Sequence, residues 1–320
     1  MTLLSRRTAL GAGLAVLAAP RLARAAWPER QITLIVPFGA GAGTDMTGRN
    51  IAQYLTKDFG QPVVVLNRPG AGGAVGYTAL AEAAPDGYTI GITNTPGVVI
   101  IPIERSVRFG INTFTPLAGV IEDPAVFAVH PDSGINNAAE LIARAKREPG
   151  LVTVSIQGVG GSAWVSAKML EQATGAKFEL VSYNAGTAAV LALVKRDVVV
   201  GTANLGEGIM MTSGQPWKVL GVMSAQRNPL APDVPTFREQ GIDVVSTTVR
   251  GLSAPPNLPA EIAARYAAAL DRMAADAEFQ ALCRRTFQPL NYMPAQRFAE
   301  HIRAEDRLFR DMWQRQPWSQ

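Results

Sequence analysis

One local pattern recurs along this chain: a short apolar strand, a loop of small residues and a helix. In its clearest copy, a strand at residues 63–66 runs into a glycine-rich loop at 67–73. A helix is expected over about 75–84, and the next strand follows at 88–92. Strands and helices that alternate in this way build an α/β fold, whose loops gather at the strand ends around a pocket lined by backbone groups. Such a pocket suits binding better than catalysis.

The same alternation continues through most of the chain. Further strands are expected at residues 31–38, 125–129, 152–155, 178–181, 198–202 and 218–222, and further helices from near 45, over 137–146 and 163–173, and up to 195. Asn137 and Glu140 have the spacing of a capping box. From Pro259 to Met312 the chain is expected to be mostly helical, with Pro259 and Pro294 as first helical residues. Its two apolar stripes are Ile262, Tyr266, Leu270 and Met273, and Phe298, Ile302, Phe309 and Met312.

The first 25 residues are expected to be an export signal that is cleaved near Ala25. Arg6 and Arg7 form a twin-arginine (Tat) pattern, the apolar run at 9–19 is too short to span a bilayer, and residues 23–25 give an A-x-A cleavage site. A disordered basic N-terminus and the general export route are the alternatives. The segment contains four arginines and no acid, so 26 basic and 26 acidic residues remain. This balance gives no support for nucleic-acid binding.

Residue types typical of catalysis and of metal binding are sparse. His130 and His301 are the only histidines, and neither has a Cys, His or carboxylate at metal-ligand spacing. Cys283 is the only cysteine, so no disulfide can form within one chain. We therefore expect no catalytic residue, no metal and no cofactor in a soluble periplasmic protein, although the sequence leaves a Ser–His–Asp arrangement open.

Four loops of small residues form the candidate binding site: 39–45, 68–73, 158–162 and 183–187. Each is expected between a strand and a helix N-terminus, where free N–H groups and the positive helix end attract an anion. The first lacks the spacing of a nucleotide-binding loop, so a simple turn is its alternative. Loops from two domains would hold a carboxylate without a fixed cation. The candidate ligand-binding residues in and beside the loops are Phe38, Gly39, Ala40, Gly43, Thr44, Asp45, Gly158, Gly160, Ser162, Tyr183, Gly186, Thr187 and Asn204.

Asp45 needs a separate interpretation, because a carboxylate repels a bound carboxylate. We expect Thr44 or Asp45 to cap the helix that follows, or Asp45 to order the loop. If the ligand has an amine or a hydroxyl, Asp45 is instead placed to bind that group.

Four sequence blocks together carry a family resemblance. They are residues 27–45, with Val36-Pro37-Phe38 and Gly43-Thr44-Asp45; 67–89, with Asn67-Arg68-Pro69-Gly70 and Asp86-Gly87-Tyr88-Thr89; 227–241; and 250–259. In this order they resemble the Bug-type periplasmic solute-binding receptors of tripartite tricarboxylate transporters. The resemblance covers nearly the whole chain after residue 25.

The resemblance implies an α/β, two-domain periplasmic binding protein type II fold with a ligand cleft at the hinge. Domain 1 would contain residues 26–124 and 248–320, and domain 2 residues 125–247. The implied function is capture of a small organic carboxylate and its delivery, through transient contacts, to membrane transporter subunits. A monomer is expected. An exported enzyme that acts on an organic acid and a periplasmic sensor input protein are the alternatives.

The chain departs from the family pattern in ways that bear on the ligand. Ala40 and Ala42 dilute the glycines of the first loop, a lysine of the fourth loop is replaced by Asn184, and a histidine is replaced near Trp164. Loss of the lysine argues against a highly charged tricarboxylate. Trp164 and Tyr183 either stack on an aromatic acid or pack in the core or at the cleft rim.

Arg250 is the candidate charged contact, because the expected crossover between the domains brings it toward the cleft. Its planar guanidinium group suits a carboxylate. The alternative is an arginine that is exposed to solvent or forms a salt bridge between the domains. The candidate ligands are dicarboxylates, tricarboxylates, aromatic acids and acidic amino acids.

Overall fold

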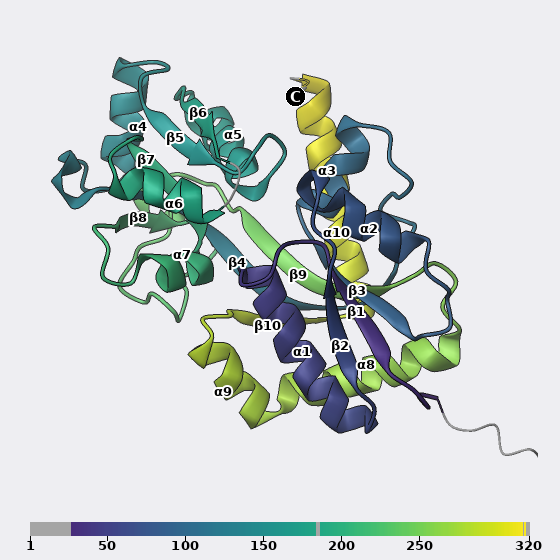
Figure 1. Ribbon diagram of the computed structural model, residues 1–320. Helices are drawn as coiled ribbons and strands as arrows, with labels where there is room; N and C mark the ends of the chain where they lie inside the picture. The colour runs from purple at the N-terminus through teal and green to yellow at the C-terminus, as the bar shows by residue number, and fades with distance from the viewer. Residues whose placement is uncertain (1–26, 184–185, 316, 318–320) are drawn as a thin grey trace, which may run out of the picture.

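The computed structural model describes residues 27–183, 186–315 and 317; the expected export signal lies outside them (Figure 1). The strands in the described part are β1 (Ile32–Val36), β2 (Val63–Asn67), β3 (Thr89–Asn94), β4 (Thr115–Val129), β5 (Thr153–Ile156), β6 (Glu179–Ser182), β7 (Val200–Asn204), β8 (Lys218–Val222), β9 (Thr247–Ala254) and β10 (Leu290–Pro294). The helices are α1 (Gly43–Phe59), α2 (Ala74–Ala81), α3 (Gly97–Glu104), α4 (Ala138–Arg147), α5 (Ser162–Thr174), α6 (Gly186–Val194), α7 (Leu205–Thr212), α8 (Ala260–Ala275), α9 (Ala277–Arg285) and α10 (Ala295–Arg315).

These strands form one mixed sheet in the order β2-β1-β3-β9-β4-β7-β5-β6, with β8 and β10 also paired to β4. The central strand β4 is 15 residues long and pairs along its first part with β9 and β10, and along residues 125–129 with β7 and β8. It therefore joins two lobes (Figure 1). Lobe 1 contains β1–β3, β9, β10 and the first part of β4, with α1–α3 and α8–α10. Lobe 2 contains β5–β8 and the last part of β4, with α4–α7.

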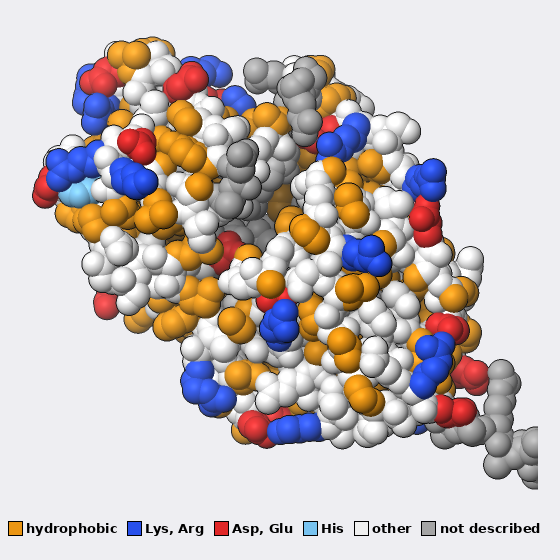
Figure 2. Space-filling model, viewed as in Figure 1, with side chains coloured by type: hydrophobic (Ala, Val, Ile, Leu, Met, Phe, Trp, Pro, Cys, Tyr) orange, Lys and Arg blue, Asp and Glu red, His pale blue; other side chains and the backbone are white. Residues whose placement is uncertain are grey.

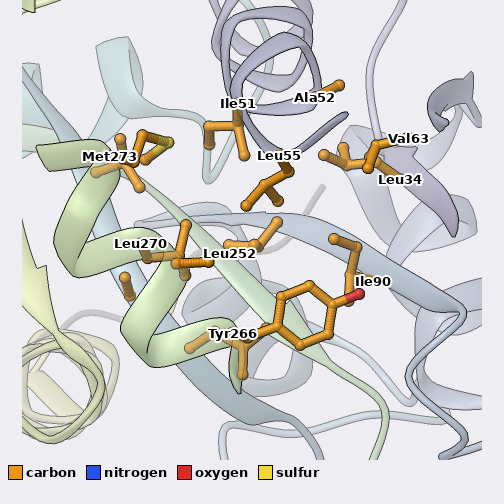
Figure 3. Packing of buried hydrophobic residues seen from close by; sticks show 14 of the residues in the cluster. Leu34, Ile51, Ala52, Leu55, Val63, Ile90, Leu252, Tyr266, Leu270 and Met273 are labelled. Atoms are coloured by element: carbon orange, nitrogen blue, oxygen red, sulfur yellow. The ribbon is translucent and has the colours of Figure 1, made fainter. Parts of the chain in front are cut away.

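Lobe 1 has apolar cores on both faces of its sheet. On one face α1 packs Ile51 and Leu55 against Leu34 and Ile90, while α8 adds Tyr266 (Figure 3). On the other face, α2, α3 and α10 form a second core. Ile51 and Leu55 are four residues apart, so they lie on one face of α1, and each is fully buried. Burial of each side chain contributes roughly 1.5–3 kcal/mol to folding.

Lobe 2 is built in the same way on a smaller scale. Phe127 of β4 lies between Phe178 and Phe237, with ring centroids 6.4 and 5.8 Å away. The helices α4 and α5 cover this core, whereas α6 and α7 pack in clusters that include Val126 and Ala128. Neighbouring residues of β4 alternate between the two faces, so both faces of the strand are buried.

The structure confirms the alternating strands and helices and both apolar stripes, which are buried. Asn137 caps α4 by accepting from the Glu140 N–H at 2.8 Å, as expected. The helical tail is interrupted by β10, and both α8 and α10 begin one residue after the expected prolines. Three further elements, α3, α7 and β9, were not predicted as such. Among the described residues no helix combines the length and apolar content needed to cross a membrane.

Candidate functional site

The loop between β1 and α1 is ordered by Asp45. Its Oδ2 accepts hydrogen bonds from the Gly41 N–H at 2.9 Å and from Arg49 Nε at 2.8 Å, and its Oδ1 accepts one from Asn67 Nδ2 at 2.9 Å. Burial acts to raise the pKa of this carboxyl, but the three hydrogen bonds outweigh it, so the pKa lies below its usual value. Asp45 therefore uses its carboxylate to fix the loop.

The start of α1 differs from the expected capped helix. The helix begins at Gly43, and its N-cap residue, Ala42, makes no side-chain capping hydrogen bond. The capping role expected for Thr44 or Asp45 is therefore wrong, since both lie within the helix and each bonds elsewhere. Thr44 Oγ1 accepts from Asn94 Nδ2 at 2.6 Å. Phe38 is half-buried beside this loop, and Gly39 and Ala40 are exposed.

Arg250 lies in a buried ion pair at the junction of the lobes. Its side chain on β9 is 1% exposed, and its Nη1 donates to Asp123 Oδ2 at 2.9 Å. Burial raises the pKa of Asp123 and the Arg250 charge opposes this shift. The other Asp123 oxygen accepts from the Gly206 N–H at 2.9 Å. The salt-bridge alternative therefore describes Arg250 in this structure, and a ligand contact stays a prediction.

Glu207 of α7 connects lobe 2 to the start of α1. Its Oε1 accepts from the Gly43 N–H at 2.9 Å and lies 3.6 Å from Arg250 Nη2. Sequence reasoning missed both Glu207 and Asp123. Asp123 stood at the expected crossover, which was a usable signal, but nothing local to Glu207 indicates that it meets a residue 164 positions earlier.

The loops of lobe 2 bring their own candidates to the junction. Gly158 and Gly160 have φ of 101° and 75°, a region that favours glycine, and α5 then begins at Ser162 with no side-chain cap. A Cβ on Gly160 would collide with the carboxylate of Glu104 at the end of α3, so this loop packs against lobe 1.

The last loop and Asn204 complete the set of predicted residues. Tyr183 is half-buried; α6 begins at Gly186, and Thr187 is exposed, whereas residues 184–185 lie outside the described part. Asn204 is buried at the end of β7 and accepts from Thr248 Oγ1 at 3.2 Å. Trp164 is 5% exposed within a core cluster, which agrees with its packing alternative. The surface between the two lobes is hollowed (Figure 2).

Both histidines bond within their own segment. His130 Nδ1 accepts a hydrogen bond from the Asp132 N–H at 3.2 Å, and His301 Nε2 lies 3.1 Å from Glu305 Oε1. No group of three or more His, Cys, Asp or Glu side chains suited to a metal ion occurs in the described residues.

Two α/β lobes joined by continuous strands, with glycine-rich loops at their junction, define a solute-binding receptor. The chain belongs to the tripartite tricarboxylate transporter family of receptors, because residues 47–312 match the family model described as "Tripartite tricarboxylate transporter family receptor". It is 31% identical to the protein BugT of Bordetella pertussis over 218 residues, which cover 67% of each chain. The Bug-type resemblance is thereby confirmed.

Two solved structures agree with this fold over nearly all of the chain. The R. palustris protein Rpa4515, in a structure with adipate, is 25% identical, with a TM-score of 0.82 over 90% of this chain and 98% of that one. MatC from Rhodopseudomonas palustris, with bound malate, is also 25% identical, with a TM-score of 0.78 over 89% and 99%. The expected two-domain α/β fold is confirmed.

Proposed function

We propose that this protein captures a small organic carboxylate between its lobes in the periplasm and delivers it to a tripartite tricarboxylate-type membrane transporter. The observation that carries the proposal is the agreement with the adipate and malate complexes over about nine-tenths of the chain. We further propose that the protein acts as a monomer without catalysis and meets the transporter subunits transiently.

The proposed ligand site lies where the two lobes meet. The helix α5 begins there without a side-chain cap, so its first N–H groups are suited to a carboxylate, whereas the Gly43 N–H at the start of α1 is already bound by Glu207. The predicted residues of loops 38–45, 158–162 and 183–187 and Asn204 are the proposed contacts. The proposal includes domain boundaries at 124/125 and 247/248. It also includes export by the twin-arginine route, directed by the signal in residues 1–25.

Thermal unfolding of the purified protein tests this function. The ligands are a panel of mono-, di- and tricarboxylates, aromatic acids and amino acids. A ligand at about 100 times its Kd should stabilise the folded state by roughly 2.7 kcal/mol, which is a shift of a few degrees in a protein of this size. A selective shift by one acid class supports the receptor. If no acid shifts the transition of protein shown by native mass spectrometry to be free of ligand, carboxylate binding is contradicted.

A further inference from the structure

The end of the junction beside α1 already holds a carboxylate that belongs to the chain. Glu207 reaches from lobe 2 to the Gly43 N–H, and its side chain is only 15% exposed. The backbone next to Glu207 is in close contact with lobe 1. The Gly206 N–H donates to Asp123, and Gly206 lies so close to the Phe287 carbonyl that a Cβ would collide with it. The first turn of α7 is therefore docked on lobe 1, which places the backbone of Glu207 beside the start of α1.

The charges at this end do not balance. Arg250 contributes one positive charge, and Asp123 and Glu207 contribute two negative charges within 3.6 Å of its guanidinium group. Arg49, in the second turn of α1, is bound to Asp45. The N-terminus of α1 supplies only about half a positive charge. A further carboxylate would meet the charge of Glu207, whereas an ammonium or hydroxyl group would find an acceptor in it.

We propose that Glu207 is a specificity-determining residue of the receptor. It disfavours a second carboxylate beside the start of α1, and it selects ligands that have one carboxylate and a hydrogen-bond donor, an ammonium or a hydroxyl group, at the opposite end. The inference rests on the proposed function, because it assumes that the ligand binds at the junction of the lobes. It narrows the substrate class from carboxylates in general to amino- and hydroxycarboxylates.

Isothermal titration with ligands of matched length tests the inference. The pairs are succinate with 4-aminobutyrate, glutarate with 5-aminopentanoate, and terephthalate with 4-(aminomethyl)benzoate. In at least one pair, wild-type protein should bind the amino acid at least tenfold more tightly than the dicarboxylate. In Glu207→Gln this ratio should fall at least tenfold, because glutamine keeps the size of the side chain and an acceptor for Gly43 but removes the charge.

Two further variants test whether the change in the affinity ratio is specific to Glu207. Glu207→Ala should move the ratio in the same direction, so the inference does not depend on one substitution. Glu261→Gln, on an exposed position of α8 in lobe 1, should leave it unchanged. Because the ratio compares two ligands on one protein preparation, loss of folded protein does not affect it.

The outcomes separate the two proposals. Wild-type protein that binds dicarboxylates as tightly as their amino partners, or a ratio unchanged in Glu207→Gln, overturns the role of Glu207 and leaves the receptor function intact. If no acid of these pairs or of the wider panel binds wild-type protein, the receptor function itself fails, and the inference fails with it.

Discussion

At the scale of single residues, Asp45 explains how a loop rich in small residues holds one shape. Its carboxylate is 3% exposed and ties together the loop, the second turn of α1 and the end of β2. A buried carboxylate of this kind must be ionised to keep its hydrogen bonds. Its contribution to stability therefore depends on pH in a predictable direction.

Asp45→Asn should destabilise the protein by about 1–3 kcal/mol at pH 7. The pKa of Asp45 is lower in the folded protein than its ordinary value of 3.8, so ionisation favours the folded state. The stabilisation is complete above pH 3.8 and is lost as the pH falls through the folded value. Urea unfolding from pH 7 to pH 3 should show the gap between wild type and variant closing at the acidic end.

The control for this prediction is Asp132→Asn, which removes an exposed ion pair with Arg196. Its cost should stay within about 1 kcal/mol. A gap between wild type and Asp45→Asn that is equally large at pH 7 and pH 3 would show that the carboxylate charge is not what stabilises the loop.

The residue scale also shows where sequence reasoning stops. The sequence-based expectation that Asp45 orders the loop is confirmed. It could be predicted because the partners Gly41 and Arg49 each lie four positions from Asp45 in the sequence. Asn67 is 22 positions away, and the Arg250–Asp123 pair is separated by 127. Such contacts depend on strand order, which a single sequence does not determine.

At the scale of elements, α7 is the helix that sequence analysis missed and that the junction needs most. Gly206 and Gly208 fall within its eight residues, and each glycine lowers helix propensity by about 1 kcal/mol relative to alanine. The strands and the long apolar stripes were predictable because their periodicity is local. The helix α7 has no such pattern, since its first turn is fixed by contacts with Asp123 and Gly43.

The two glycines of α7 should respond in opposite ways to alanine. Gly206→Ala places a Cβ against the Phe287 carbonyl and should destabilise the protein by roughly 1–3 kcal/mol. Gly208→Ala places its Cβ 3.5 Å from Ala203 Cβ, an ordinary contact, and should stabilise by about 0.5–1 kcal/mol through helix propensity. Urea unfolding of both variants measures the difference. Equal effects would mean that the close approach at Gly206 is not specific.

At the scale of the whole molecule, two strands mark the links between the lobes: β4, which runs through both, and β9, which begins where the chain returns from lobe 2 to lobe 1. They pair with each other from Thr115 with Ala254 to Pro124 with Thr247. Strands that cross between two lobes are a common site of hinge bending, and a ligand that contacts both lobes favours the closed arrangement. Closure is therefore expected to change distances between the lobes and to leave distances within each lobe unchanged.

Spin labels at Val75 and Leu191 should report this closure by pulsed electron paramagnetic resonance. Both side chains are nearly half exposed, on α2 in lobe 1 and α6 in lobe 2. Cys283 can remain, because it is 1% exposed and burial raises the pKa of its thiol to about 12, so it should not react with the label. A saturating carboxylate should shift and narrow the distance distribution between the lobes.

The matched control places the labels at Val75 and Leu308, both in lobe 1 and both exposed. This distance should not change with ligand, because one sheet and its two cores hold lobe 1 together. A change in both pairs would mean that lobe 1 itself rearranges. If the distance between the lobes does not change although titration confirms binding, the ligand enters an arrangement that is already closed. The crossings at β4 and at the start of β9 would then be rigid and would not act as hinges.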